Sequence, residues 1–152
     1  MKRDIGFVLI QFVLFALYII NFKIIDYKID LPSWIDIFLL ILGFVAAVII
    51  TMGVINLNEN LTPFPSPRRN SSLVSNGIYR HIRHPIYTGI IALMFTYGLY
   101  SGSMGRLVIT VILIVVFYFK TELEEKLLIK RFPEYRDYRK VAGRFFPRVA
   151  RK

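Results

Sequence analysis

Long apolar runs, separated by segments that carry most of the charge, constrain the fold of this chain more than any other feature. About 20 apolar residues cross the hydrocarbon core of a bilayer as a helix, and shorter runs suffice where the bilayer thins. The mean hydropathy of +0.53 and the 55% of hydrophobic residues are too high for an ordinary soluble domain of 152 residues. The pattern predicts an all-α, polytopic membrane protein with transmembrane helices over 5–22, 34–57, 86–101 and 106–131.

The last two predicted helices are joined by the short turn-forming segment "SGSMG". This spacing predicts a C-terminal helical hairpin, because a short connection leaves two helices antiparallel and adjacent. The fourth helix continues past its apolar part into "KTELEEKLLIKRF", which has strong helix formers and no breaker before Pro133. We therefore expect this helix to leave the membrane and to extend into water.

The distribution of basic residues predicts the orientation of the chain. With the N-terminus in the cytosol, all of the 20 Lys and Arg residues lie in cytosolic segments except Lys23, Lys28 and Arg106. This arrangement follows the positive-inside rule. It predicts a single domain over 1–152, with cytosolic termini, a cytosolic loop over 58–84 and a cytosolic tail over 132–152. The first apolar run lacks a small-residue cleavage site, so we expect a retained helix.

The motif "RHPIYTG" lies where the loop meets the third apolar run. Pro85 fits the first helical position, and the free backbone N–H groups of that first turn form a local anion site. Arg83 and His84 add side-chain donors, and Gly89 removes bulk where a ligand or a neighbouring helix approaches. A carboxylate or a phosphate suits this site. The alternative is a helix start with Tyr87 placed in the interfacial aromatic belt.

A second polar cluster begins where the fourth apolar run ends. Glu124 and Glu125 are costly at the end of a membrane helix unless they face water or a cation. Lys120 and Glu124 share a helix face, so an ordinary surface ion pair is one explanation. The hairpin, however, brings the glutamates close to the predicted anion site at His84. Together the two clusters complement a ligand that carries both a carboxylate and an ammonium group.

Several motifs in order carry a resemblance to a known family. "TPFPSP", "LVSNGIYRHIRHPIYTG", "EEKLLIKRF", "EYRDYRKV" and a late "FP" resemble the isoprenylcysteine carboxyl methyltransferase and phospholipid methyltransferase family of membrane enzymes. The resemblance extends over 61–147. It implies that S-adenosylmethionine binds in a cytosolic pocket made by the loop motif, the glutamate helix and the tail. It also implies a lipophilic methyl acceptor that enters from the bilayer.

The resemblance also implies roles for single residues. Glu124 or Glu125 would receive the ammonium group of the cofactor, and two tyrosines of the tail would close the pocket. With the residues of the predicted anion site, the candidate contacts of the cofactor are Arg83, His84, Pro85, Tyr87, Gly89, Glu124, Glu125, Tyr135 and Tyr138.

The candidate catalytic residues are Lys120, Glu124 and Glu125. The family tends to place an arginine about one turn before the paired glutamates, to orient the acceptor or to supply a catalytic cation. This chain has Lys120 there, and lysine lacks the planar fork that holds a carboxylate in plane. The sulfonium group of S-adenosylmethionine already activates the methyl group for transfer. The protein must therefore mainly align the methyl acceptor with that methyl group and exclude water.

Three functions fit these observations. The first is O-methylation of the carboxylate of an isoprenylcysteine-like acceptor, and the second is N-methylation of an amine phospholipid headgroup, with a glutamate as proton acceptor. The third is a non-enzymatic protein whose basic, aromatic-rich tail lies on anionic lipid headgroups. No cysteine and only two histidines argue against a metal centre. No nucleic-acid recognition motif accompanies the basic tail.

Overall fold

The computed structural model describes residues 2–20, 31–67 and 70–148, and it is helical throughout its main body. The helices start and end close to the predicted positions. The predicted end of the first helix and the very end of the tail lie outside the described residues. The main elements are α1 (Lys2–Ile20), α2 (Ser33–Leu57), α3 (Pro85–Tyr100), α4 (Met104–Arg131) and α5 (Tyr135–Val141), with the short 3-10 turns η2 (Asn58–Asn60) and η3 (Gly77–Arg80) between α2 and α3.

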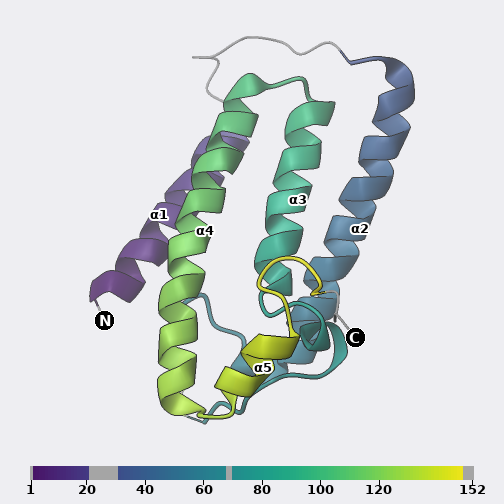
Figure 1. Cartoon of the computed structure of the whole chain (residues 1–152). Coiled ribbons are helices and arrows are strands. Elements are labelled where there is room, and N and C mark those ends of the chain that lie inside the picture. Colours follow the sequence, from purple (N-terminus) through teal and green to yellow (C-terminus); the bar gives the residue numbers. More distant parts are fainter. Residues whose placement is uncertain (1, 21–30, 68–69, 149–152) are drawn as a thin grey trace.

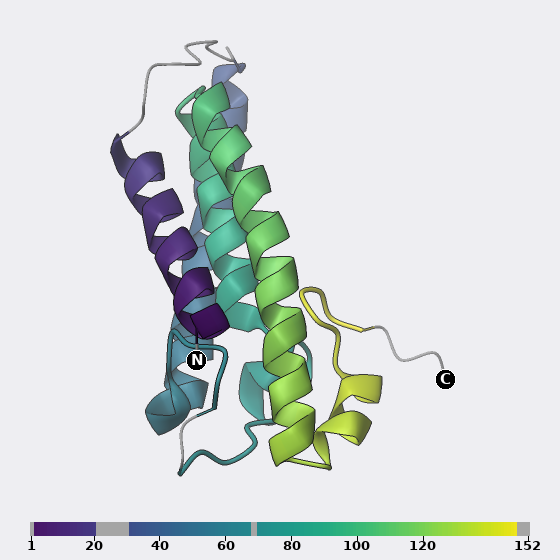
Figure 2. The ribbon, with the colours of Figure 1, turned by 90° about the vertical axis from the view of Figure 1, so that its left-hand side faces the viewer.

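The four long helices pack side by side, with α3 between α2 and α4 and with α1 against α4 (Figures 1 and 2). The start of α1, the loop after α2 and the short helix α5 lie toward the same end of this bundle (Figure 1). The polar segments that follow α2 and α4 thus meet at the end where α4 extends beyond its apolar part. This arrangement confirms the all-helical prediction and gathers the predicted site residues at one end.

Helices α2 and α3 approach closely because both carry glycine at their contact. A Cβ atom on Gly89 would lie 2.8 Å from the carbonyl oxygen of Ala46 and 2.5 Å from Ile50 Cγ1. A Cβ atom on Gly53 would lie 2.7 Å from Ile86 Cγ1. From the sequence, either a ligand or a neighbouring helix is expected beside Gly89. The structure places the backbone and side chains of α2 there.

The predicted hairpin of α3 and α4 is present, and its turn has a clear local cause. Gly102 takes a positive φ of 60°, which glycine adopts without strain. The Ser103 hydroxyl then accepts a hydrogen bond from the Arg106 N–H and caps α4. Beyond the turn, the two helices and α1 share a core of Leu14, Tyr18, Met94, Leu113 and Phe117.

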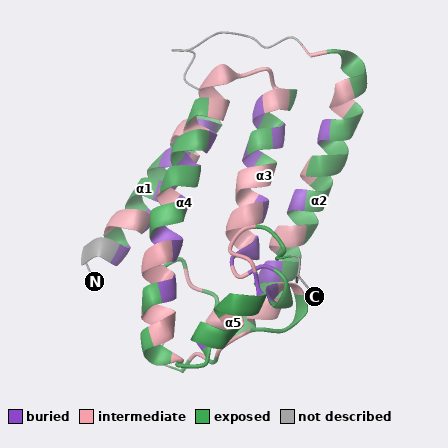
Figure 3. Cartoon of the chain, viewed as in Figure 1, coloured by how far each residue is buried: buried purple, intermediate pink, exposed green. Residues whose placement is uncertain are grey.

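Exposed residues occur along all four long helices (Figure 3), and many of them have large apolar side chains. Trp34, Phe44 and Ile19 each expose more than two thirds of their surface. By length and composition, two helices suffice to cross a membrane, over Ser33–Asn60 and Met104–Arg131, whereas α3 and the apolar part of α1 are shorter. Such outward-facing apolar surface suits lipid, and the four-helix topology stays a prediction.

The C-terminal tail folds back onto the start of α3. The N–H of Arg83 donates to the carbonyl of Gly143 at 2.8 Å, and the N–H of His84 donates to the carbonyl of Arg144 at 3.1 Å. The N–H of Gly143 in turn donates to the carbonyl of His81. The basic tail, which the resemblance implies as part of the cofactor pocket, therefore packs against the loop motif.

Candidate functional site

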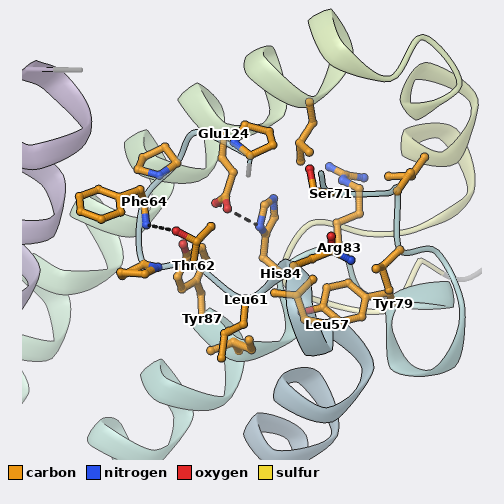
Figure 4. A pocket seen from close by; sticks show the side chains of 18 of the residues that line it. Leu57, Leu61, Thr62, Phe64, Ser71, Tyr79, Arg83, His84, Tyr87 and Glu124 are labelled. Carbon is orange, nitrogen blue, oxygen red and sulfur yellow. Dashed lines mark hydrogen bonds and ion pairs between the residues drawn. The ribbon is translucent and has the colours of Figure 1, made fainter. Parts of the chain in front are cut away.

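A cavity of about 340 Å³ lies at the polar end of the bundle, between the loop after α2, the start of α3, α4 and α5 (Figure 4). This volume falls in the range of small-molecule pockets in proteins. Much of its wall is apolar and comes from the proline-rich loop, with Leu61, Phe64 and Pro65 among its residues. Of the predicted site residues, those that line the cavity are Arg83, His84, Tyr87, Lys120, Glu124, Tyr135 and Tyr138.

The remaining predicted residues, Pro85, Gly89 and Glu125, are not among the described residues that line the cavity. Pro85 takes the first position of α3, as predicted, and is buried against α2 beside Gly53. Gly89 also packs against α2. The structure thus assigns these two residues to the start of α3 and to the contact between two helices.

Glu124 faces the cavity with a carboxylate that is only partly compensated. Its Oε2 atom is buried, and no described group is a hydrogen-bond partner for it. The same atom lies 3.8 Å from Nδ1 of His84, as the dashed line in Figure 4 marks. Tyr87 interacts with this carboxylate from the next helix. Since an unpaired buried carboxylate oxygen is costly, Glu124 is available to a cationic ligand.

Glu125 has the opposite environment, although it is the next residue in the chain. Its Oε1 atom lies 2.9 Å from Nε of Arg83, 3.2 Å from Nε2 of His84 and 3.4 Å from Nε of Arg144. Its Oε2 atom forms an ion pair with Nε of Arg139 at 3.3 Å, although it has no hydrogen-bond partner among the described residues. Two of these arginines belong to the tail, so Glu125 joins α4 to the tail and to the loop motif. Its charge is balanced without any ligand.

His84 lies between the two glutamates, with its ring stacked on Tyr87 at a centroid distance of 5.7 Å. Its Nε2 atom is within hydrogen-bond distance of Glu125, whereas Nδ1 is 3.8 Å from Glu124. The N–H of Thr88, in the first turn of α3, donates to the His84 carbonyl. The structure therefore pairs His84 with carboxylates of the protein, whereas the sequence suggests an anionic ligand there.

Arg83 lines the cavity but uses its guanidinium to hold the tail. Nε donates to Glu125, and Nη1 donates to the carbonyl oxygens of Arg139, at 3.1 Å, and of Ala142. Together with the backbone hydrogen bonds of the tail, these contacts fix α5 over the cavity. Arg83 thus acts on the site mainly through the position of the tail.

Lys120 contributes a cation to the wall of the cavity, one helical turn further into the bundle than Glu124. The side chain is fully buried, and its Nζ atom donates to Oε1 of Gln11 at 2.5 Å. The ammonium group also lies 5.1 Å from the ring centroid of Tyr87. Gln11 itself lines the cavity and is missed by the sequence analysis. The signal that could have found it is a polar residue in the middle of an apolar run.

Three tyrosines form the side of the cavity nearest the tail. The hydroxyl of Tyr138 donates to the carbonyl of Tyr79, and the hydroxyl of Tyr79 donates to the carbonyl of Gly53. The Tyr135 hydroxyl is buried, and within the described part of the chain it has no hydrogen-bond partner. Burial raises the pKa of Tyr135 and of Tyr138 well above the usual value, so both hydroxyls stay protonated.

A comparison with protein families supports the resemblance that the motifs carry. A family model described as phospholipid methyltransferase matches residues 34–135. The chain belongs to this family of membrane methyltransferases. The matched segment extends from the start of α2 to the start of α5, so it contains His84, Lys120 and Glu124. Helix α1, which supplies Gln11, precedes it.

Two curated proteins are similar to this membrane methyltransferase chain. The cobalt-zinc-cadmium resistance protein CzcN of Cupriavidus metallidurans is 30% identical over 123 residues, which cover 78% of this chain and 53% of the relative. The nickel-cobalt-cadmium resistance protein NccN of Alcaligenes xylosoxydans xylosoxydans is 29% identical over 123 residues, which cover 78% of this chain and 54% of the relative. The chain thus spans about half the length of the curated relatives it matches.

Proposed function

We propose that this protein transfers a methyl group from S-adenosylmethionine to a lipophilic acceptor at the cytosolic edge of the membrane. The observation that carries the proposal is two buried oxygen atoms in one cavity that lack a hydrogen-bond partner. The Glu124 Oε2 atom and the Tyr135 hydroxyl are both buried without a hydrogen-bond partner among the described residues. Buried polar groups are rarely left unpaired in a native protein, so a ligand that completes them is the simplest explanation.

The residues of the cavity fit the cofactor. Glu124 would receive its ammonium group, and the Tyr135 hydroxyl would donate to its polar atoms. The aromatic ring of Tyr79, which also lines the cavity, favours a positively charged ligand nearby. When bound, S-adenosylmethionine supplies a methyl group on a positively charged sulfur, which a nucleophile can accept directly. The protein then has to align the acceptor and to keep water out.

The carboxylate of an isoprenylcysteine-like molecule is the acceptor that we favour. An ionised carboxylate is already nucleophilic, so it needs orientation rather than a base. The buried ammonium group of Lys120 lines the cavity one turn from Glu124 and would orient such a carboxylate. Lys120 would then supply charge where relatives in the family tend to have arginine.

The amine headgroup of a phospholipid is the second candidate acceptor. An amine must lose a proton before it can accept a methyl group, and the unpaired oxygen of Glu124 would take that proton. The description of the matching family, phospholipid methyltransferase, favours this candidate. Glu124 cannot hold the cofactor ammonium and accept this proton at the same time, so the two candidates assign it different roles.

Calorimetry on the purified protein in nanodiscs, with S-adenosylmethionine and with its demethylated product, tests the proposal. We expect measurable binding of both compounds. Radiolabelled cofactor with either N-acetyl-S-farnesylcysteine or phosphatidylethanolamine then separates the acceptors, because a methyl ester is hydrolysed by base and an N-methyl group is not. If the folded protein binds neither compound, both methyltransferase functions are excluded. The non-enzymatic function, binding of anionic lipid headgroups, would then be the remaining one.

Metal tolerance is the physiological setting that the names of the two relatives suggest for this methyl transfer. We propose that methylation of a membrane component contributes to such tolerance. Cells that express the chain should grow better in cobalt, zinc or cadmium than cells that express Glu124→Gln at the same level. Equal growth of the two strains would contradict a contribution of this methyl transfer to metal tolerance.

A further inference from the structure

Lys120 and Gln11 form a buried polar pair between α4 and α1. Nζ of Lys120 lies 2.5 Å from Oε1 of Gln11, and neither side chain is more than 7% exposed. A lysine ammonium in apolar surroundings is costly unless a polar partner compensates it. Tyr87 adds one face of its ring at 5.1 Å from Nζ. The ammonium is therefore held between an amide oxygen and an aromatic face.

Both members of the pair also line the cavity, so the pair is part of the site. A lysine ammonium has three N–H donors, and one of them goes to Gln11. Glu124 lies one helical turn away on the same face of α4 and lines the same cavity. The cavity thus has a carboxylate nearer the tail and a cation nearer the middle of the bundle.

Helix α1 contacts the wall of the cavity at a second point. The Ser66 hydroxyl donates to Oδ2 of Asp4 at 2.6 Å, and Ser66 lies between two prolines, Pro65 and Pro67, that line the cavity. Gln11 is about two helical turns further along α1 than Asp4. Helix α1 therefore supports both the proline-rich loop and the ammonium of Lys120, although it precedes the segment that the family model matches.

We propose that Gln11 is a positioning residue that holds the ammonium of Lys120 at the wall of the cavity. Lys120 then binds an anionic group of the acceptor, a carboxylate or a phosphate. This inference rests on the proposed function. A merely structural Gln11 would stabilise the packing of α1 on α4, and its loss would affect every ligand of the cavity alike.

Kinetics with N-acetyl-S-farnesylcysteine and with phosphatidylethanolamine test the inference, using whichever is methylated. Gln11→Leu keeps the approximate size of the side chain and removes the Oε1 atom that accepts the hydrogen bond from Lys120. We expect the KM for the acceptor to rise about tenfold, the Kd for S-adenosylmethionine to stay within about twofold, and Gln11→Glu to restore most of the loss. Unchanged acceptor KM, or a parallel loss of cofactor affinity, would overturn the inference.

The double variant Gln11→Leu with Lys120→Met separates action through Lys120 from an independent effect. If Gln11 acts through Lys120, the double variant should have the same acceptor KM as Lys120→Met alone. Multiplied effects of the two substitutions would contradict the inference. Thermal unfolding of all variants in the same detergent shows that each one is folded.

A readout that does not depend on turnover keeps this test separate from the proposed function. Acetic anhydride modifies free lysine amines, and mass spectrometry reports the extent at Lys120. Gln11→Leu should change the rate of Lys120 acetylation several-fold and leave that of the exposed Lys126 unchanged. If the wild-type protein binds no S-adenosylmethionine, the proposed function fails. Equal Lys120 rates in the wild-type protein and in Gln11→Leu would overturn the positioning role in either case.

Discussion

Glu124 and Glu125 are consecutive in α4, yet one carboxylate is left open to a cavity and the other is enclosed by basic groups. Oε2 of Glu124 lies 3.8 Å from Nδ1 of the His84 ring and has no hydrogen-bond partner among the described residues. Oε1 of Glu125 has the Nε atom of Arg83 at 2.9 Å and the His84 ring at 3.2 Å. The sequence does not distinguish the two glutamates, whereas the structure gives them different surroundings.

Glutamine substitutions should therefore have different consequences at these two positions. Glu124→Gln should weaken S-adenosylmethionine binding about ten- to a hundredfold, because a charged hydrogen bond contributes about 1.5–3 kcal/mol. Glu125→Gln should instead loosen the tail, since it removes the charge that Arg83, Arg139 and Arg144 share. Calorimetry measures the first effect, and hydrogen exchange of residues 135–147 measures the second. Glu122→Gln, an exposed neighbour paired with Lys126, is the matched control.

The contradictory result is equally clear. If Glu125→Gln lowers cofactor affinity as much as Glu124→Gln does and leaves exchange of the tail unchanged, then Glu125 is a direct ligand and its pairing with the arginines is secondary.

The contact between α2 and α3 predicts an intolerant glycine. In Gly89→Ala the new methyl group would meet the carbonyl oxygen of Ala46, which cannot move without shifting α2. Overpacking of this kind costs about 1–3 kcal/mol. Gly6→Ala in α1 is the matched control, since its Cβ would have open space and alanine favours a helix by about 0.5–1 kcal/mol. In thermal unfolding in one detergent, the melting temperature of Gly89→Ala should be below that of the wild type. The melting temperature of Gly6→Ala should equal or exceed that of the wild type.

The long helices could be predicted from the sequence because apolar runs and their breakers act locally. The hairpin of α3 and α4 follows from "SGSMG", and the long α4 follows from its unbroken helix formers. The position of the tail could not be predicted in this way. It depends on Arg83, which contacts Glu125 and two carbonyl groups that are far from it in the chain.

Within the site, the sequence predicts which segments lie close together. It does not predict which charged side chains pair with each other. Motifs and the hairpin geometry place His84 near the glutamates. Which glutamate meets the arginines depends on side-chain directions along α4, and these follow only from the packed structure. Gln11 illustrates the same limit, since its partner Lys120 lies on another helix more than 100 residues away.

The absence of cysteine from the chain allows a direct test of the predicted topology. We expect the loop after α2 and helix α5 to face the cytosol, and the turn after α3 to face the other side. Single-cysteine variants Asn76→Cys and Arg136→Cys should react with a membrane-impermeant maleimide only from the cytosolic side, and Ser101→Cys only from the opposite side. Labelling of Ser101→Cys and Asn76→Cys from the same side would contradict a hairpin that crosses the bilayer.

Two tyrosines of the tail differ in their hydrogen bonds, which predicts opposite effects of losing the hydroxyl. Tyr138→Phe removes the hydrogen bond to the Tyr79 carbonyl, so the free energy of unfolding should fall by about 1 kcal/mol. Tyr135→Phe removes a hydroxyl that is unpaired among the described residues, so the ligand-free protein should keep or gain stability. The same Tyr135→Phe change should lower cofactor affinity several-fold. Equal effects of both changes on stability and on binding would contradict a ligand role for the Tyr135 hydroxyl.

The buried tyrosines also predict how stability depends on pH. Burial raises the pKa of Tyr135, Tyr138 and Tyr79 above the usual value of 10.0. Below pH 10 these hydroxyls are protonated in both the folded and the unfolded chain. Above pH 10 the unfolded chain loses these protons first, so it binds fewer protons than the folded protein and the free energy of unfolding falls as pH rises.

Each such group lowers the free energy of unfolding by up to about 1.4 kcal/mol per pH unit above pH 10. Thermal unfolding between pH 8 and pH 11 should therefore show a plateau followed by a decline. Tyr135→Phe, which removes the most deeply buried of these hydroxyls, should make the decline shallower, whereas Tyr100→Phe, an exposed residue, should not. An unchanged slope in Tyr135→Phe would mean that this hydroxyl titrates at its ordinary pKa, and that the tail does not keep the cavity closed to water.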